Sequence, residues 1–185
     1  EIAWARAAKE TPLTPNDILF TASHTHCGPG AWAPGIAGYM TGGKYDPKIP
    51  EILGNAFGDA IIEAYKKLAP AKMAHGKADA SQYIHNRARK DPVDTELNFL
   101  VVENDKQEKC YAVRFSAHPT NYDDDMMQFS AEFPGALQRD IAKATNGFAM
   151  YMGGSIGSCS PSAPEGPTPD ARIEALGQAL ADLVL

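Results

Sequence analysis

A short segment with two histidines, residues 18–30, is the feature that most constrains the fold of this chain. It begins with an apolar tripeptide and ends with Gly-Pro-Gly, and His24 and His26 stand between them, two positions apart. This pattern predicts a buried strand over residues 17–23 that ends in a glycine loop. Because alternate residues of a strand point to the same side, both imidazoles could then reach one point. Neutral imidazole is a common zinc ligand, so a metal site is one interpretation and ordinary surface or core histidines are the other.

The composition is that of an ordinary globular protein. The chain has 185 residues, which is enough for one domain with a sizeable core. Its net charge of -6 and the lack of a basic run argue against nucleic-acid binding, and no apolar stretch is long enough to span a bilayer. The cysteines are only three and lie far apart, so we expect free or buried thiols rather than a disulfide framework or a zinc ribbon.

Apolar periodicity predicts both helices and strands. Helices are expected over residues 2–9, 46–68, 130–141 and 168–183, with Ser130 and Thr168 at two of the helix starts. Strands are expected over residues 17–23, 72–80, 97–103, 110–117 and 148–152. A short polar stretch joins the third and fourth of these strands, as in a hairpin, whereas the long glycine-rich stretch 27–45 is typical of a binding loop or a mobile surface loop. We therefore predict an α/β (α+β) fold, a mixed β-sheet with helices packed on its faces.

Three of the predicted strands end in polar or glycine-rich loops, at His24, at His118 and at Gly153. In open α/β sheets, ligands bind at the carboxyl ends of the strands. If these three ends are adjacent, His24, His26 and His118 share one cleft with the glycine-rich loop that follows residue 152.

Several motifs, taken in order, resemble those of the neutral/alkaline (non-lysosomal) ceramidase family. The segment His-Thr-His-Cys-Gly-Pro-Gly, which starts at His24, is similar to the family's His-Thr-His-Ser-Gly-Pro-Gly. Four further segments resemble its Asn-Arg pair, its Phe-Ala-x-His strand end, its Ser-Gly/Ala-Asp segment and its Gly-Asp-x-x-Pro loop, and they are residues 86–87, 115–120, 130–135 and 152–161. The chain thus resembles the N-terminal domain of this family.

The resemblance implies a site and a reaction. His24 and His118 would bind Zn²⁺, and His26 and Arg87 would hold and polarise the amide oxygen of the substrate or a neighbouring hydroxyl. The zinc ion would act as a Lewis acid and lower the pKa of a bound water or hydroxyl, while the arginine would stabilise the developing oxyanion. The reaction would be hydrolysis of an amide in a lipid or small molecule, in the family the N-acyl bond of ceramide. The resemblance also implies a secreted, periplasmic or membrane-associated protein.

Two departures from the family pattern change this expectation. The family's catalytic serine falls on Gly154, which has no nucleophile, and Ser155 stands where the family has asparagine. The family's other zinc ligands, a glutamate and a tyrosine, would lie beyond Leu185, and its first strand would precede the chain. We therefore expect residues 1–185 to be a fragment of one ceramidase-like domain that acts through zinc-bound hydroxide. The missing ligands would come from outside this fragment or from residues 123–125.

Other interpretations remain open at this point. Arg87 is close to Arg89 and Lys90, so it could belong to a solvated basic loop. Glu132 could orient a liganding histidine, or it could be an acid favoured by a helix dipole. A relic of the fold that binds a ligand or partner without chemistry is the first alternative to an enzyme, and Gly154 supports it. A different His-x-His metal hydrolase, such as an amidohydrolase barrel, is the second alternative, and the predicted hairpin argues against it.

Overall fold

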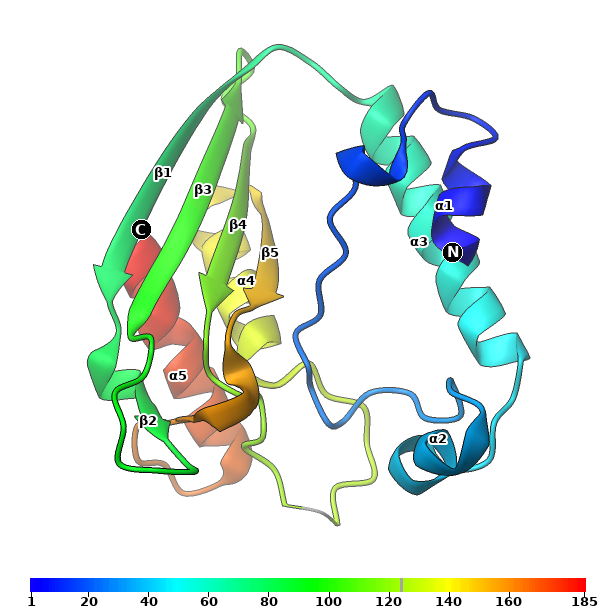
Figure 1. The fold of residues 1–185 in the computed structure, drawn as a ribbon. Coiled ribbons are helices and arrows are strands. Elements are labelled where there is room, and N and C mark those ends of the chain that lie inside the picture. The colour runs from blue at the N-terminus through cyan, green and yellow to red at the C-terminus, as the bar shows by residue number, and fades with distance from the viewer. Residues whose placement is uncertain (124) are drawn as a thin grey trace. The chain divides into compact units, whose positions relative to one another are not determined.

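The computed structural model describes residues 1–123 and 125–185, which divide into two compact units. The first unit comprises Glu1–Phe20 and Pro29–Ala69, and the second comprises Thr21–Gly28 and Pro70–Leu185. Figure 1 shows the helices and strands of both units. Residues 21–28, which include both His24 and His26, therefore belong to the same unit as the sheet. That the two units form one domain stays a prediction.

The first unit is built from helices. They are α1 (Ile2–Ala7), the 3₁₀ turn η1 (Pro15–Asp17), α2 (Gly35–Gly42) and α3 (Lys48–Lys66), and the sequence predicts α1 and α3 among them. Helix α1 packs closely on α3, where a Cβ added to Gly58 would lie only 2.5 Å from the Cβ of Arg6. The expected apolar face of α3 is buried only in part, because Ile62 is covered whereas Phe57 is 55% exposed. Helix α2 lies within the stretch that the sequence predicts as a long loop.

The second unit is organised around a mixed four-stranded sheet, which confirms the predicted fold class. The strand order is β1 (Ala71–Asp79), β3 (Glu96–Asn104), β4 (Lys109–Phe115) and β5 (Phe148–Gly153). The pairs β1–β3 and β3–β4 are antiparallel, and β4–β5 is parallel. The predicted hairpin is thus present, and this sheet excludes a barrel of repeated βα units over the described residues. A small second sheet pairs β2 (Ile84–Asn86) with β6 (Cys159–Pro161).

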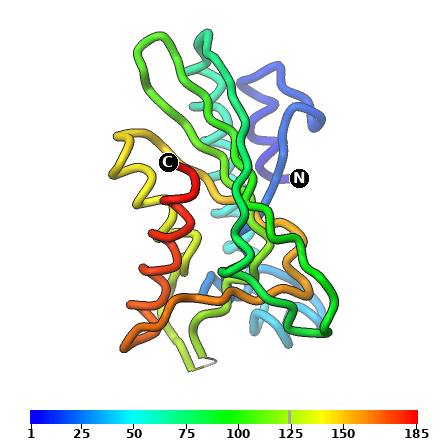
Figure 2. Tube along the Cα trace, turned by 90° about the vertical axis from the view of Figure 1, so that its left-hand side faces the viewer, coloured from blue at the N-terminus to red at the C-terminus, as the bar shows by residue number. Residues whose placement is uncertain are grey.

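Two helices, α4 (Glu132–Thr145) and α5 (Pro169–Val184), pack against each other and cover the same face of the sheet (Figures 1 and 2). Helix α5 begins as predicted, because the Thr168 hydroxyl accepts the N–H of Ala171 at 3.1 Å. The core between sheet and helices consists of fully buried side chains, among them Leu97, Val113, Phe115, Phe133, Leu137, Ile141, Leu176 and Leu180. Within the described residues, no helix combines the length and the apolar character needed to cross a membrane.

The predicted buried strand over residues 17–23 is wrong. Residues 18–23 form no strand in the structure, and the side chains of Leu19 and Phe20 are 81% and 57% exposed. The segment touches the sheet at one end, where the Gly153 N–H donates to the Ala22 carbonyl at 3.0 Å. An extended segment becomes a strand only where a neighbour supplies a ladder of hydrogen bonds. The apolar tripeptide indicates a preference for extended backbone, but it does not determine whether a neighbouring strand pairs with it.

Candidate metal centre

Three imidazoles from two distant segments meet at one place in the second unit. His24 and His26 lie in the segment 21–28, and His118 lies three residues beyond the end of β4. One ring nitrogen of each lies within 4.8 Å of the others, and the Nε2 atoms of His26 and His118 are 3.0 Å apart. The ring centroids are separated by 4.6 to 5.3 Å. The sequence therefore predicted correctly that these three histidines lie close together.

His118 is held in one orientation by the backbone around it. Its side chain is 4% exposed, its N–H donates to the Cys159 carbonyl at 3.0 Å, and its Nδ1 lies 3.2 Å from the carbonyl oxygen of Ile156. Because a carbonyl oxygen only accepts hydrogen bonds, Nδ1 must carry the proton. In the neutral ring, the lone pair is then on Nε2, which is the nitrogen that faces His26. This is the arrangement of a metal-ligating histidine whose second nitrogen is fixed by an outer partner.

His24 reaches the cluster through a left-handed backbone conformation rather than through strand geometry. Its φ angle is 65°, in the left-handed region that non-glycine residues seldom adopt. The alternation argument for His24 and His26 is therefore wrong, although the two rings do converge. A strained backbone at a histidine is expected where surrounding contacts impose it, and such positions concentrate at functional sites.

The electrostatic surroundings keep two of these rings neutral. Burial lowers the pKa of His24, and the charges of His26 and Arg87 lower it further. Burial also lowers the pKa of His118, where the hydrogen bond to Ile156 opposes the shift and the charge of Arg87 adds to it. Neutral imidazole is the form that binds metal. A metal ion therefore competes with fewer protons for these two imidazoles.

These pKa shifts predict a pH dependence of stability in the metal-free protein. Both folded-state pKa values lie below the ordinary 6.5, so between 6.5 and the lowered values the unfolded chain binds more protons. The free energy of unfolding should therefore be fully retained above pH 6.5 and fall as the pH drops through that window. Urea unfolding of the apoprotein from about pH 7.5 to about pH 5 measures it. A His118→Asn variant with an unchanged pH slope would contradict this origin of the effect.

The donor set fits a divalent transition metal ion. Imidazole suits zinc, copper, iron and nickel, and three nitrogen ligands with an open position are typical of catalytic rather than structural zinc. Asp123 and Asp125 are not part of the cluster, and Asp124 lies outside the described residues. The three histidines could therefore hold a metal ion, and zinc stays a prediction.

Arg87 follows β2 and is exposed, but it is anchored to the loop beyond β5. Its Nε and Nη2 donate to the Gly157 carbonyl at 3.2 and 3.0 Å, and its backbone N–H donates to the Ser158 carbonyl at 2.8 Å. Its charge acts on the pKa of both His24 and His118, so it lies within electrostatic reach of the cluster. The role of Arg87 in the site stays a prediction.

Gly154 immediately follows β5, and a buried polar group occupies the space beside it. An ideal Cβ at this position would lie 2.5 Å from Ser116 Oγ and 2.9 Å from Arg114 Nε. Its backbone N–H donates to the Phe115 carbonyl at 2.9 Å, which fixes the loop against the end of β4. A side chain at position 154 would therefore collide with Ser116 Oγ and the Arg114 guanidinium.

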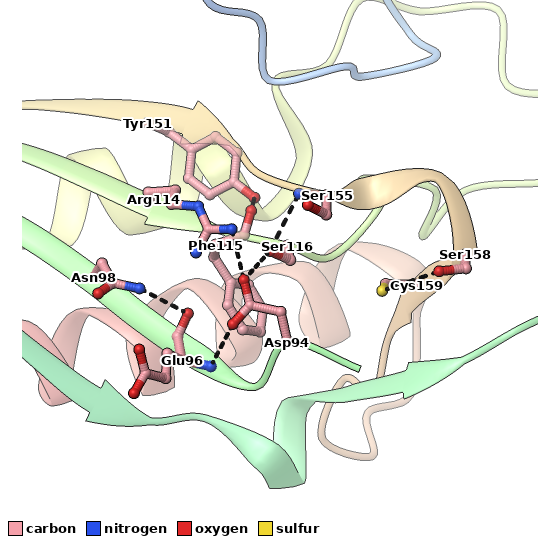
Figure 3. A network of polar contacts seen from close by, with 10 residues as sticks. All are labelled: Asp94, Glu96, Asn98, Arg114, Phe115, Ser116, Tyr151, Ser155, Ser158 and Cys159. Carbon is pink, nitrogen blue, oxygen red and sulfur yellow. Dashed lines mark hydrogen bonds and ion pairs between the residues drawn. The ribbon is translucent and has the colours of Figure 1, made fainter. Parts of the chain in front are cut away.

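This neighbouring group is a network around the Asp94 carboxylate (Figure 3). Asp94 Oδ2 accepts from Arg114 Nη2 at 2.5 Å and from Ser116 Oγ at 3.1 Å, and the Ser116 hydroxyl accepts the N–H of Ser155 at 3.3 Å. Burial raises the pKa of Asp94, but the bonds from Arg114 and Ser116 bring it below its ordinary value. Sequence reasoning missed this network. The signal for it was the period-two run of polar residues 114, 116 and 118 at the end of β4.

Two solved structures share this arrangement of elements. The chain is similar to neutral ceramidase from Pseudomonas aeruginosa, with a TM-score of 0.76 and 17% identity over 98% of this chain and 33% of that chain. A ceramidase complexed with C2 gives a TM-score of 0.77 and 16% identity, again over 98% of this chain and 33% of the other.

The chain has a ceramidase fold. This confirms the resemblance drawn from the motifs at the level of the fold. The chain spans about a third of the length of these ceramidases, 33% in each case. No model of a known protein family matches it, and no curated protein does. The likeness at this identity extends to architecture alone, so the roles of the site residues are matters of proposal.

Proposed function

We propose that the protein is a metal-dependent hydrolase of an amide bond, of the N-acyl, ceramide-like type or a related one. The observation that carries the proposal is the convergence of His24, His26 and His118, whose ring nitrogens lie within 4.8 Å of one another on a ceramidase fold. His24 and His118 would hold Zn²⁺. Their lowered pKa values favour the neutral, ligating form at neutral pH. The ceramidase fold supports a lipid substrate.

The remaining site residues would act on the substrate. His26 is exposed and places a ring nitrogen 3.0 Å from that of His118, so it can hydrogen-bond the oxygen of an amide held at the same point. Arg87 supplies a fixed positive charge nearby, which would stabilise the oxyanion of the tetrahedral state. A bound Zn²⁺ contributes Lewis-acid activation of a carbonyl or of water. In this assignment the protein orients and polarises the substrate.

Water, rather than a side chain, would be the nucleophile. Gly154 offers no reactive group, and Ser116 and Arg114 fill the space beside it. The Ser116 hydroxyl is fully buried and accepts the N–H of Ser155, so it serves the loop instead of the substrate. A Ser155→Ala change should leave hydrolysis intact, and loss of activity with metal retained would assign Ser155 the attack.

A non-catalytic relic of the same fold is the second candidate, and Gly154 is the observation that favours it. The two candidates differ in their expected metal content and activity. The intact protein should bind about one zinc ion and hydrolyse an N-acyl sphingoid base, an N-acyl amino acid or a simple ester, with activity lost to a chelator. Metal binding without hydrolysis of any of these would favour the relic, and so would absence of metal.

Replacing Arg87 with alanine tests the catalytic assignment. We expect kcat to fall by about 10²–10³, the typical cost of losing a group that stabilises an oxyanion, while the zinc content is unchanged. Arg89→Ala is the matched control, because Arg89 is an exposed arginine two residues away on the same loop. Equal kcat values for the two variants would show that Arg87 is only part of a basic loop.

A further inference from the structure

Glu132 is a buried carboxyl group in an unusual backbone conformation. It is the first residue of α4, its side chain is 2% exposed, and its φ angle is 50°. A glutamate is seldom fully buried unless it is paired, and a left-handed φ is strained for a residue with a Cβ. Both features persist only where surrounding contacts impose them. The contacts of the carboxylate show what imposes them.

The carboxylate bridges the two segments that bear the histidines. Its Oε2 accepts the N–H of Asn121 at 2.5 Å, three residues after His118, and its Oε1 accepts the hydroxyl of Thr25 at 3.3 Å, between His24 and His26. Burial raises the pKa of Glu132, and this rise is opposed by hydrogen bonds from Asn121, from Thr25 and from the backbone of Tyr122 and His26. One side chain thus receives donors from both sides of the cluster.

Further bonds fix Glu132 to the histidine segment. The Thr25 hydroxyl shares its single proton between Glu132 Oε1 and the nearer Ser130 carbonyl, at 2.8 Å, and the Ser130 N–H donates to the Cys27 carbonyl at 3.1 Å. The Glu132 N–H donates to the Ser130 hydroxyl at 3.0 Å. Ser130 was predicted to cap α4, but the N-cap is Ala131, and Ser130 instead supports the strained residue.

A favourable interaction with the helix dipole does not account for these contacts. An interaction with the helix dipole requires neither full burial of the acid nor donors from other segments. Glu132 is instead buried, where the charged form is costly, and its donors come from segments outside the helix. Burial against the backbone of both histidine segments points to a role between them.

We propose that Glu132 is a positioning residue that holds His24 and His118 at the spacing a divalent metal ion needs, with His26 beside them. This inference rests on the proposed function, because it presumes that the cluster binds metal. The carboxylate has lone pairs for several donors at once, whereas an amide has one accepting oxygen and an NH₂ group that would face other N–H groups. Neutralising Glu132 should therefore release one of the two segments and misalign the ring nitrogens.

The test compares Glu132→Gln and Glu132→Asp with Glu174→Gln in the intact protein. Glu174 is the control because it is an exposed glutamate that pairs with Arg139 on the helix surface, away from the histidines. Zn²⁺ affinity is measured by competition with a chelator, and the ligand geometry by the absorption spectrum of the Co²⁺ form. We expect Glu132→Gln to weaken Zn²⁺ binding about 10- to 100-fold and to alter the spectrum, with partial recovery in Glu132→Asp.

The outcomes separate this inference from the proposed function. Wild-type protein that binds no Zn²⁺ would overturn the metal site itself. Wild-type binding with equal affinity and an unchanged Co²⁺ spectrum in Glu132→Gln would overturn the role of Glu132 alone. Should Glu132→Gln not fold, Thr25→Val takes its place in the test, since it removes the hydroxyl whose proton Glu132 and Ser130 share, with little change of shape. Wild-type Zn²⁺ affinity in that variant would also overturn the inference.

Discussion

Replacing His118 with alanine is expected to weaken Zn²⁺ binding by at least ~100-fold, more than the loss of an outer-shell partner costs. The reason is that this ring is the most rigidly held of the three. It is 4% exposed, and its Nδ1 is fixed by the Ile156 carbonyl, so Nε2 is oriented before any metal arrives. His24→Ala should act in the same direction. Zinc content per chain and a chelator-competition titration measure both effects.

The control for this prediction is His75→Ala. His75 is an exposed histidine on β1 and lies outside the cluster, so its removal tests whether any lost imidazole lowers metal uptake. Far-UV circular dichroism of each variant shows whether the fold is kept. If His118→Ala folds and still takes up zinc like the wild type, the three histidines are not the metal site and the hydrolase proposal loses its basis.

A Gly154→Ser substitution is expected to destabilise the fold by about 1–3 kcal/mol, the usual cost of overpacking a filled site. The new Cβ would lie 2.5 Å from Ser116 Oγ and 2.9 Å from Arg114 Nε. Arg114 is restrained by its bond to Asp94, so it yields only at the cost of that ion pair. Urea unfolding of the metal-free proteins measures the change in free energy.

The same loop supplies a matched control. A Cβ added to Gly157 meets no atom within 4 Å, so Gly157→Ser should change stability by less than about 0.5 kcal/mol. Ser116→Ala removes the nearest obstructing atom, and in that background Gly154→Ser should cost less than in the wild type. Additive effects in this double-mutant cycle would mean that Ser116 does not exclude a side chain at position 154.

The packing around Gly154 decides whether a side chain at that position could take part in catalysis. If Ser116 excludes a side chain at position 154, the absence of a nucleophile there is part of a packed arrangement around Asp94. A serine introduced at position 154 would then lack the space to act as a nucleophile. The histidine cluster and this network meet in the loop beyond β5, since Ile156 orients His118 and the N–H of Ser155 donates to Ser116. Metal binding and loop packing should therefore be coupled.

The local sequence pattern was sufficient to predict most of the helices and strands. Apolar runs predicted β3 and β4, and the short polar stretch between them predicted their hairpin. The Thr-Pro pair at residues 168–169 predicted the start of α5. These features depend on residues that are close in the sequence, so the sequence pattern alone predicts them. The histidine motif and the strand ends likewise indicated which imidazoles meet.

Tertiary contacts decided how those imidazoles meet. Residues 17–23 had the composition of a strand but acquired no pairing, and His24 turns into the site through a left-handed backbone instead. The tautomer of His118, the filled space beside Gly154 and the bridge made by Glu132 each depend on atoms supplied by distant segments. The bond from Thr25 to Glu132, for example, joins residues 107 positions apart. Sequence periodicity describes a residue's own segment, and it contains no information about which remote donor will reach a buried carboxylate.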